Sequence, residues 1–178
     1  MTHRWGRSCV FLPFLLLLCG LRGQANARSD ETGPVNNYTA ILTGDKMVPP
    51  LNTSAHGEVD FSIHHHIHSK DDTAAYTITL FQVNHLIEVD LRQAHEGQPG
   101  DKIATLWRPS PNGLGQEVNG VLKHGTLTRK EMSKGPMSKG DMNELMKRAD
   151  NGDIYVLVTT VEFPNGLLRG QMEPVDTG

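Results

Sequence analysis

Strict alternation of apolar and polar residues in one stretch constrains the fold more than any other feature of the sequence. Val59, Phe61 and Ile63 fall on one face of an extended chain, whereas Asp60 falls on the other. A second alternating run, residues 76–80, follows after a polar loop. Together the two runs predict a β-hairpin with one buried face.

Further short strands are expected along the chain between turns rich in glycine and proline, at residues 38–42, 87–91, 103–107, 154–161 and 167–172. One helix is predicted over 141–149, because apolar side chains recur there at helical spacing. Residues 130–140 have the composition of a surface loop. The pattern predicts an all-β, mainly antiparallel fold with one short helix, either an immunoglobulin-like β-sandwich or a small Greek-key barrel.

Residues 1–27 are typical of a secretory signal peptide. Arg4 and Arg7 precede an apolar run, residues 10–18, and Ala25-Asn26-Ala27 provides a small-x-small cleavage site. The run is shorter than the roughly 20 residues that a membrane-spanning helix needs. Cys19 resembles a lipid-attachment site, but such sites require a small residue where this chain has a leucine. We therefore expect a secreted, extracellular protein with no membrane span.

Cleavage after residue 27 defines the expected domain organisation. A polar leader, residues 28–37, precedes one β-domain, residues 38–174, and a short tail, residues 175–178. The mature chain contains no cysteine, so no disulfide stabilises its core. It has 14 basic and 20 acidic residues, since the signal peptide removes three of 17 arginines and lysines, and this net charge of −6 excludes a nucleic-acid-binding surface of ordinary kind.

Five motifs occur in an order and spacing that resemble the CHRD (chordin) domain family. They are Tyr38-Thr39-Ala40-x-Leu42-Thr43-Gly44-Asp45-x-x-Val48-Pro49-Pro50, the single glycine Gly57, Ala94-His95-x-Gly97-x-x-Gly100, Gly152-x-x-Tyr155-Val156, and Pro164-x-Gly166-x-x-Arg169-Gly170-Gln171. The resemblance covers about residues 38 to 174. It implies an immunoglobulin-type sandwich that acts as an extracellular binding or matrix-associated module, with an unidentified extracellular protein or matrix component as its partner.

The resemblance implies little about the chemistry of a functional site. Antagonism of morphogens belongs mainly to cysteine-rich modules that this chain lacks. The family also has a His-x-His-x-Gly segment and a later His-Thr, similar to the copper ligands of copper,zinc superoxide dismutase. Here these positions read Gln93, His95 and Thr159-Thr160, so only His95 remains as a weak metal candidate.

A run of histidines provides the alternative function. His64 and His66 lie on one face of the predicted strand, about 7 Å apart, which allows two imidazoles to share Zn²⁺ or Cu²⁺. His68 reaches the same ion only if the strand bends. A solvated histidine face is the favoured interpretation, and a copper- or zinc-binding extracellular protein is the alternative.

No enzyme and no cofactor are expected. The sequence contains no Gly-x-Ser-x-Gly, His-Glu-x-x-His or phosphate-binding loop. Glu88 and Asp90 share one strand face, which we interpret as the solvent side. Arg169 is predicted to have a structural role, clamping a carboxylate such as Glu58 or Asp60 or a turn carbonyl.

Two Asn-x-Ser/Thr sequons complete the candidate sites. Asn37-Tyr38-Thr39 and Asn52-Thr53-Ser54 are glycosylation acceptors if the host secretory pathway is eukaryotic.

Overall fold

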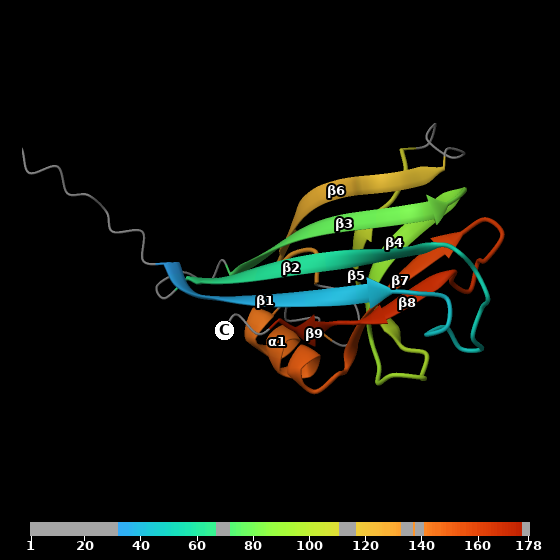
Figure 1. The fold of residues 1–178 in the computed structure, drawn as a ribbon. Coiled ribbons are helices and arrows are strands. Elements are labelled where there is room, and N and C mark those ends of the chain that lie inside the picture. The colour runs from blue at the N-terminus through green and yellow to red at the C-terminus, as the bar shows by residue number, and fades with distance from the viewer. Residues whose placement is uncertain (1–31, 67–71, 111–116, 133–136, 138–140, 176–178) are drawn as a thin grey trace, which may run out of the picture. The chain divides into compact units, whose positions relative to one another are not determined.

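The computed structural model describes residues 32–66, 72–110, 117–132, 137 and 141–175, which build two antiparallel sheets and one helix (Figure 1). The chain divides into two units, residues 1–30 and 31–178, and all of the described residues belong to the second. The two sheets confirm the predicted antiparallel β-class and favour the sandwich over the barrel.

The first sheet has five strands in the order β6-β3-β2-β1-β9. The bounds of these strands are β1 Thr32–Leu42, β2 His56–His66, β3 Thr73–Val83, β6 Val118–Thr128 and β9 Glu173–Pro174. The predicted hairpin is confirmed as β2 and β3, with Val59 opposite Ile78 and Phe61 opposite Tyr76.

The second sheet has four strands in the order β5-β4-β7-β8. Its strands are β4 Leu86–Gln93, β5 Asp101–Trp107, β7 Ile154–Thr160 and β8 Leu168–Gln171. The chain leaves β8 and enters β9 after one residue, so its last extended stretch pairs first with β7 and then with β1. This crossing and a bridge between Thr43 and Arg169 join the two sheets along one side.

The core lies between the sheets and follows from the alternation of the strands. Val59, Phe61 and Ile63 point inward from β2, and Leu91 and Val156 point inward from the opposite sheet, all almost completely buried. Because strand side chains alternate, the intervening residues point to the two outer faces. The properties of these outer faces therefore decide what the molecule can contact.

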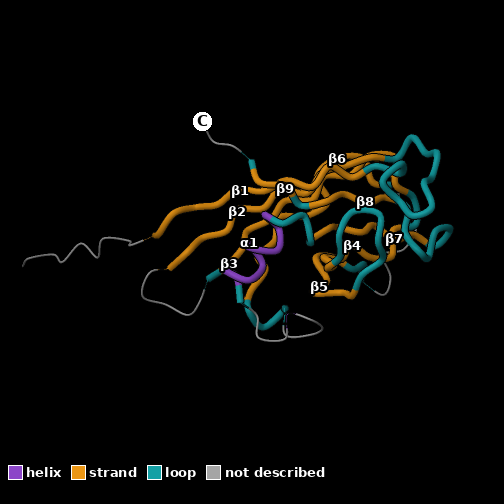
Figure 2. The backbone as a smooth tube through the Cα atoms, turned by 90° about the horizontal axis from the view of Figure 1, so that it is seen from below, coloured by secondary structure: helices purple, strands orange, loops and turns teal. Residues whose placement is uncertain are grey.

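The helix α1, Met142–Asp150, confirms the sequence prediction to within one residue at each end. Asp141 caps its first turn by accepting a hydrogen bond from the Asn143 amide, and the buried side chains Met142 and Leu145 share one face. Figures 1 and 2 show the helix beside β9. No helix in the described ranges is long and apolar enough to cross a membrane.

Two local predictions are wrong. The first strand starts at Thr32 instead of residue 38, because Asn36 and Asn37 continue the ladder with β2. Polar side chains do not end a strand whose outer face meets water. In the predicted surface loop, residues 130–140, Met132 and Met137 are buried in the core. Burial of these two large apolar side chains is favourable in free energy, although the residues around them are polar.

Candidate binding surface

Large apolar side chains that remain exposed gather at two places. Among the described residues, three of the eight lie where the 43–55 loop approaches the turn between β7 and β8, namely Val48, Val161 and Phe163. The other five belong to the outer side of the five-stranded sheet. Exposed apolar patches of this kind commonly mark interaction sites. We call the first place the loop end.

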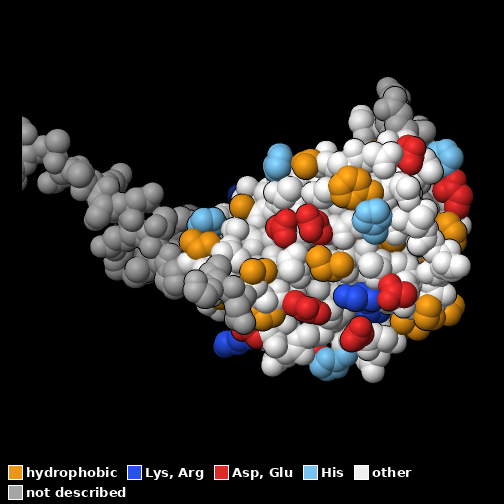
Figure 3. Space-filling view, in the orientation of Figure 1, with side chains coloured by type: hydrophobic (Ala, Val, Ile, Leu, Met, Phe, Trp, Pro, Cys, Tyr) orange, Lys and Arg blue, Asp and Glu red, His pale blue; other side chains and the backbone are white. Residues whose placement is uncertain are grey.

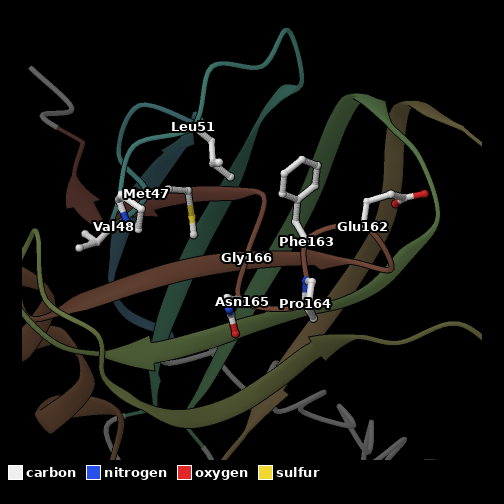
Figure 4. Close-up of a pocket in the computed structure, with 9 residues that line it drawn as sticks. Met47, Val48, Leu51, Glu162, Phe163, Pro164, Asn165 and Gly166 are labelled. Atoms are coloured by element: carbon white, nitrogen blue, oxygen red, sulfur yellow. The ribbon is translucent and has the colours of Figure 1, made fainter.

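An apolar hollow of about 240 Å³ opens at the loop end (Figure 4). Met47 and Leu51 flank it from the 43–55 loop, and Phe163 lies across from them on the turn. Val48 and Pro164 complete much of its apolar lining. A concave apolar surface with an aromatic wall is suited to receive one apolar side chain of a partner.

The 43–55 loop owes its shape to a close backbone approach. The amides of Met47 and Leu51 both donate to the carbonyl oxygen of Gly44, at 3.1 and 2.8 Å. A Cβ atom at Gly44 would lie 2.5 Å from the Leu51 carbonyl oxygen, so only glycine fits here. Met47 also packs with Leu157 and Tyr155 on the outer face of the four-stranded sheet, which anchors the loop.

The opposite wall is a tight turn. Gly166 has a φ of 123°, and its amide donates to the carbonyl oxygen of Phe163 at 3.0 Å. This positive φ favours glycine and closes the turn so that Phe163 stays exposed at its tip. The apolar hollow is therefore built by backbone geometry on both sides.

A second hollow of about 410 Å³ lies on the other side of Phe163. His85 and Glu162 line it, and the His85 Nδ1 atom forms a close ion pair with a Glu162 carboxylate oxygen. The hydrogen bond from His85 lowers the pKa of Glu162. Gln82 and His85 have φ values of 56° and 46°, and strained non-glycine backbone of this kind clusters at functional sites.

Arg169 lies on the outer face of the four-stranded sheet, where it is almost completely buried. Its guanidinium donates to the carbonyl oxygens of Gln98 and His95 at 2.7 and 2.8 Å, and it stacks over the Tyr155 ring at 3.8 Å. It contacts two turn carbonyls, and neither Glu58 nor Asp60. Burial lowers its pKa, which still leaves a guanidinium charged at neutral pH.

Gln171 supports the same turn, residues 94–100. Its amide nitrogen donates to the carbonyl oxygens of Ala94, at 2.8 Å, and Gly152. The Tyr155 hydroxyl accepts from the Gly100 amide at 3.0 Å. Three of the motifs that resemble the CHRD family thus meet at one place, where they hold the 94–100 turn against the sheet.

Glu88 and Asp90 also lie on this outer face, and the interpretation of them as its solvent side is wrong. Glu88 is 9% exposed and Asp90 is fully buried. The Lys102 ammonium lies 2.7 Å from a Glu88 oxygen and 2.8 Å from an Asp90 oxygen, and Thr105 donates to both carboxylates. Arg108 pairs with Glu88 from the rim. This network, in which buried carboxylates meet partly exposed cations, has the character of structural ion pairing.

The pKa values of the two carboxyl groups shift in opposite directions. Burial raises the pKa of Asp90, with the neighbouring charge of Glu88 acting the same way and Lys102 acting against it. Burial also opposes ionisation of Glu88, but hydrogen bonds with Lys102, Asp90, Arg108 and Thr105, in that order, outweigh it and lower the Glu88 pKa to about 2. Lys102 of β5 and Arg108, just after that strand, thus help to keep the less buried carboxylate, Glu88, ionised.

The histidine candidates are placed as follows. His64 points outward from β2, half-buried, opposite Thr73 of β3. The side chain of His66, and all of His68, lie outside the described residues. Within the described ranges no group of three or more histidine, cysteine, aspartate or glutamate side chains is arranged to hold a metal ion. Metal binding by this segment stays a prediction.

The early and late positions of the family's histidine pattern lie far apart on the four-stranded sheet. Gln93 lies at the end of β4 opposite Ile154, whereas Thr159 lies opposite Glu88, five residues back along β4. That is about 17 Å along a strand. The His95 Nδ1 atom lies 2.6 Å from an Asp153 oxygen.

The sequons lie in different settings. Asn37 points outward from the middle of β1, and its side-chain oxygen accepts a hydrogen bond from Ser62 at 2.9 Å. Asn52 is exposed on the 43–55 loop. Glycosylation of either remains untested.

Sequence reasoning missed the loop end and the buried polar groups. Phe163 follows a strand and precedes a Pro-x-Gly turn, which was the available signal for an exposed aromatic residue. Nothing local marks Glu88, Asp90 or Gln171 as buried, because the groups that cover them come from distant segments.

Comparison with known proteins identifies the family of this chain. A family model for the CHRD domain matches residues 38–172. The chain belongs to the CHRD domain family. Searches of curated proteins and of solved structures each found no significant match. Membership points to an extracellular, binding-type module and to no known enzyme family.

Proposed function

We propose that this CHRD protein is secreted and acts as an extracellular binding or matrix-associated module, whose partner docks at the loop end. Support comes from the family, from the signal-like residues 1–27 and from the exposed apolar side chains around the hollow. Binding residues are often carried by loops on a rigid scaffold. Here the two sheets provide that scaffold.

The apolar hollow beside Phe163 carries the proposal. Exposure of Val48, Val161 and Phe163 to water is unfavourable in free energy, and the fold itself does not require these side chains to be exposed. Aromatic residues beside a preformed hollow form the energetic centre of many protein interfaces. A partner that inserts one apolar side chain between Leu51 and Phe163 would cover the sides of Val48 and Phe163 that line the hollow.

Capture from extracellular medium tests the loop end. Tagged protein is compared with Phe163→Ser and with Phe81→Ser, a matched loss of one exposed phenylalanine on the outer side of the five-stranded sheet. We expect the Phe163→Ser variant to capture less than 10% of the amount of a partner protein that the parent captures specifically. The Phe81→Ser variant should capture as much of it as the parent does. Equal retention by all three proteins would contradict the loop end as the docking site.

Secretion is tested separately. We expect cleavage after Ala27, so the secreted protein should begin at Arg28, with residues 28–178 as its mature chain. N-terminal sequencing of protein from the medium checks this. A chain that still begins at Met1, or one lipidated at Cys19, would contradict the proposed processing.

A further inference from the structure

The outer side of the five-stranded sheet is a second candidate surface, which we call the open face. Most of its outward residues form four rows across the strands, and the pair His56-Phe81 and Val175 lie beyond them. The rows are Ile41-Glu58-Thr79-Val121, Glu173-Thr39-Asp60-Thr77-His124, Asn37-Ser62-Ala75-Thr126 and Val35-His64-Thr73-Thr128. At the edge of the fourth row the Thr128 hydroxyl donates to the carboxylate of Glu131, in the turn that follows β6, at 3.0 Å.

The open face is unusually apolar for the wet side of a sheet. Five large side chains on it are between 38% and 58% exposed, namely Val35, Ile41, Phe81, Val121 and Val175. Phe81 is stacked with His56, at 5.2 Å between ring centroids. Ile41 and Val121 lie in one row, on either side of Glu58 and Thr79.

Its charge is one-sided. Glu58, Asp60 and Glu173 lie on it, and the four rows contain no lysine or arginine. Within the described residues none of these carboxylates forms an ion pair, and Asp60 accepts only the Thr39 hydroxyl, at 3.0 Å. Figure 3 shows acidic and hydrophobic side chains interspersed on this side of the molecule.

We propose that the open face docks a protein segment of opposite charge, on which lysine or arginine side chains are mixed with aliphatic ones. Glu58 and Asp60 are two residues apart on β2, which places them about 7 Å apart. Basic side chains two residues apart on an extended partner have the same repeat. Such a segment neutralises the carboxylates while its aliphatic side chains cover Ile41 and Val121.

Charge selects this partner over other occupants. A second copy of the chain would bring the same three carboxylates together, and like charges in contact oppose association. A nucleic acid or a sulfated polysaccharide would be repelled for the same reason. Binding of a second copy is one of the outcomes that the test distinguishes.

The Asn37 sequon lies within the open face, beside Ser62. A glycan there would stand over the third row and hinder a segment lying across the strands. The test therefore uses secreted protein with Asn37→Gln, which keeps an amide oxygen for Ser62 and prevents glycosylation at this position.

The probe is a fluorescein-labelled peptide of sequence Val-Thr-Lys-Thr-Lys-Thr-Val-Thr, with a control peptide in which both lysines are glutamates. Fluorescence anisotropy measures the Kd for each. We expect the lysine peptide to bind at least tenfold more tightly than the glutamate peptide, with an affinity that falls as salt rises. Equal affinities, or no binding of the lysine peptide at millimolar protein, would overturn the proposal.

Charge-reversal variants locate the binding. Glu58→Lys, Asp60→Lys and Glu173→Lys together should raise the Kd of the lysine peptide at least tenfold. The matched variant reverses three exposed acids elsewhere, Glu96, Asp101 and Glu117, and should change the Kd by less than twofold. If both variants weaken binding equally, only net charge matters and the open face is not the site. Thermal unfolding of each variant confirms that it is folded.

Self-association is measured on the protein alone. Sedimentation at rising concentration should show a monomer whose size does not change with the triple reversal at the open face. A dimer that the triple reversal alters would assign the open face to a second copy and overturn the cationic partner.

Discussion

The tripeptide Glu-Val-Asp occurs twice, at residues 58–60 in β2 and at residues 88–90 in β4, with opposite fates. In both copies the valine points into the core and the carboxylates point to the outer face of a sheet. In β2 the carboxylates remain exposed, whereas in β4 Asp90 is fully buried. Identical local sequence therefore leaves the environment of a side chain undecided.

Distant segments make the difference. Lys102 and Thr105 reach the β4 carboxylates from β5, and Arg169 holds the 94–100 turn over the same sheet. The 43–55 loop anchors there through Met47. No comparable cover lies over the β2 carboxylates among the described residues. One outer face thus contributes to stability, and the other is free to bind.

The largest effect of breaking the covered face is expected from Arg169→Ala. The change leaves two turn carbonyls without their donor and removes the cation that stacks on Tyr155. We expect a loss of at least about 3 kcal/mol in the free energy of unfolding, measured by urea denaturation.

Arg169→Lys serves as the control. A single ammonium group cannot donate to both carbonyls in the geometry of the guanidinium fork, so it should restore less than half of the loss. If Arg169→Ala costs under about 0.5 kcal/mol, the arginine does not hold the turn, and a ligand role becomes the better explanation.

A smaller effect appears as a dependence on pH. The pKa of Glu88 is lowered from 4.5 to about 2, so its contribution to stability is fully present above pH 4.5 and is lost as the pH falls toward 2. The raised pKa of Asp90 acts with the opposite sign, since its ionised form disfavours the folded state. Glu88→Gln should therefore flatten the fall in stability across this window.

Urea unfolding of the parent and Glu88→Gln at several pH values between 5 and 2 measures this difference. Parallel curves for the two proteins would mean that Lys102 and Arg108 do not hold Glu88 ionised in the folded state.

The smallest effects belong to the exposed apolar residues. Ile41→Ser and Phe163→Ser should each change the free energy of unfolding by less than about 1 kcal/mol, because both side chains are already partly in water. Thermal unfolding checks this result. A loss above about 2 kcal/mol at either residue would show that it supports the fold and would weaken its assignment to binding.

The fold was largely predictable because its signals are local. Alternation at Val59, Phe61 and Ile63 predicts the hairpin, and Asp141 with the spacing of Met142 and Leu145 predicts the helix. The family motifs also have local signatures. These features depend on neighbours in sequence, which the sequence displays.

The site was less predictable because it depends on contacts across the chain. Arg169 was expected to clamp a carboxylate or a turn carbonyl, and only the structure identifies the carbonyls of His95 and Gln98. Glu88 and Asp90 were interpreted as solvent-facing, since nothing nearby in sequence indicates Lys102 above them. The loop end needs the 43–55 loop and Phe163 together.

The most direct test of the contrast between the two faces compares Asp90→Ala with Asp60→Ala by urea unfolding. Removing Asp90 takes away a fully buried carboxylate that pairs with Lys102 and accepts hydrogen bonds from Arg92 and Thr105, and we expect a loss of about 2 kcal/mol or more. Removing Asp60 forfeits one exposed bond from Thr39 and should cost less than about 1 kcal/mol. Equal losses at the two positions would contradict the account, because the two outer faces would then support the fold alike.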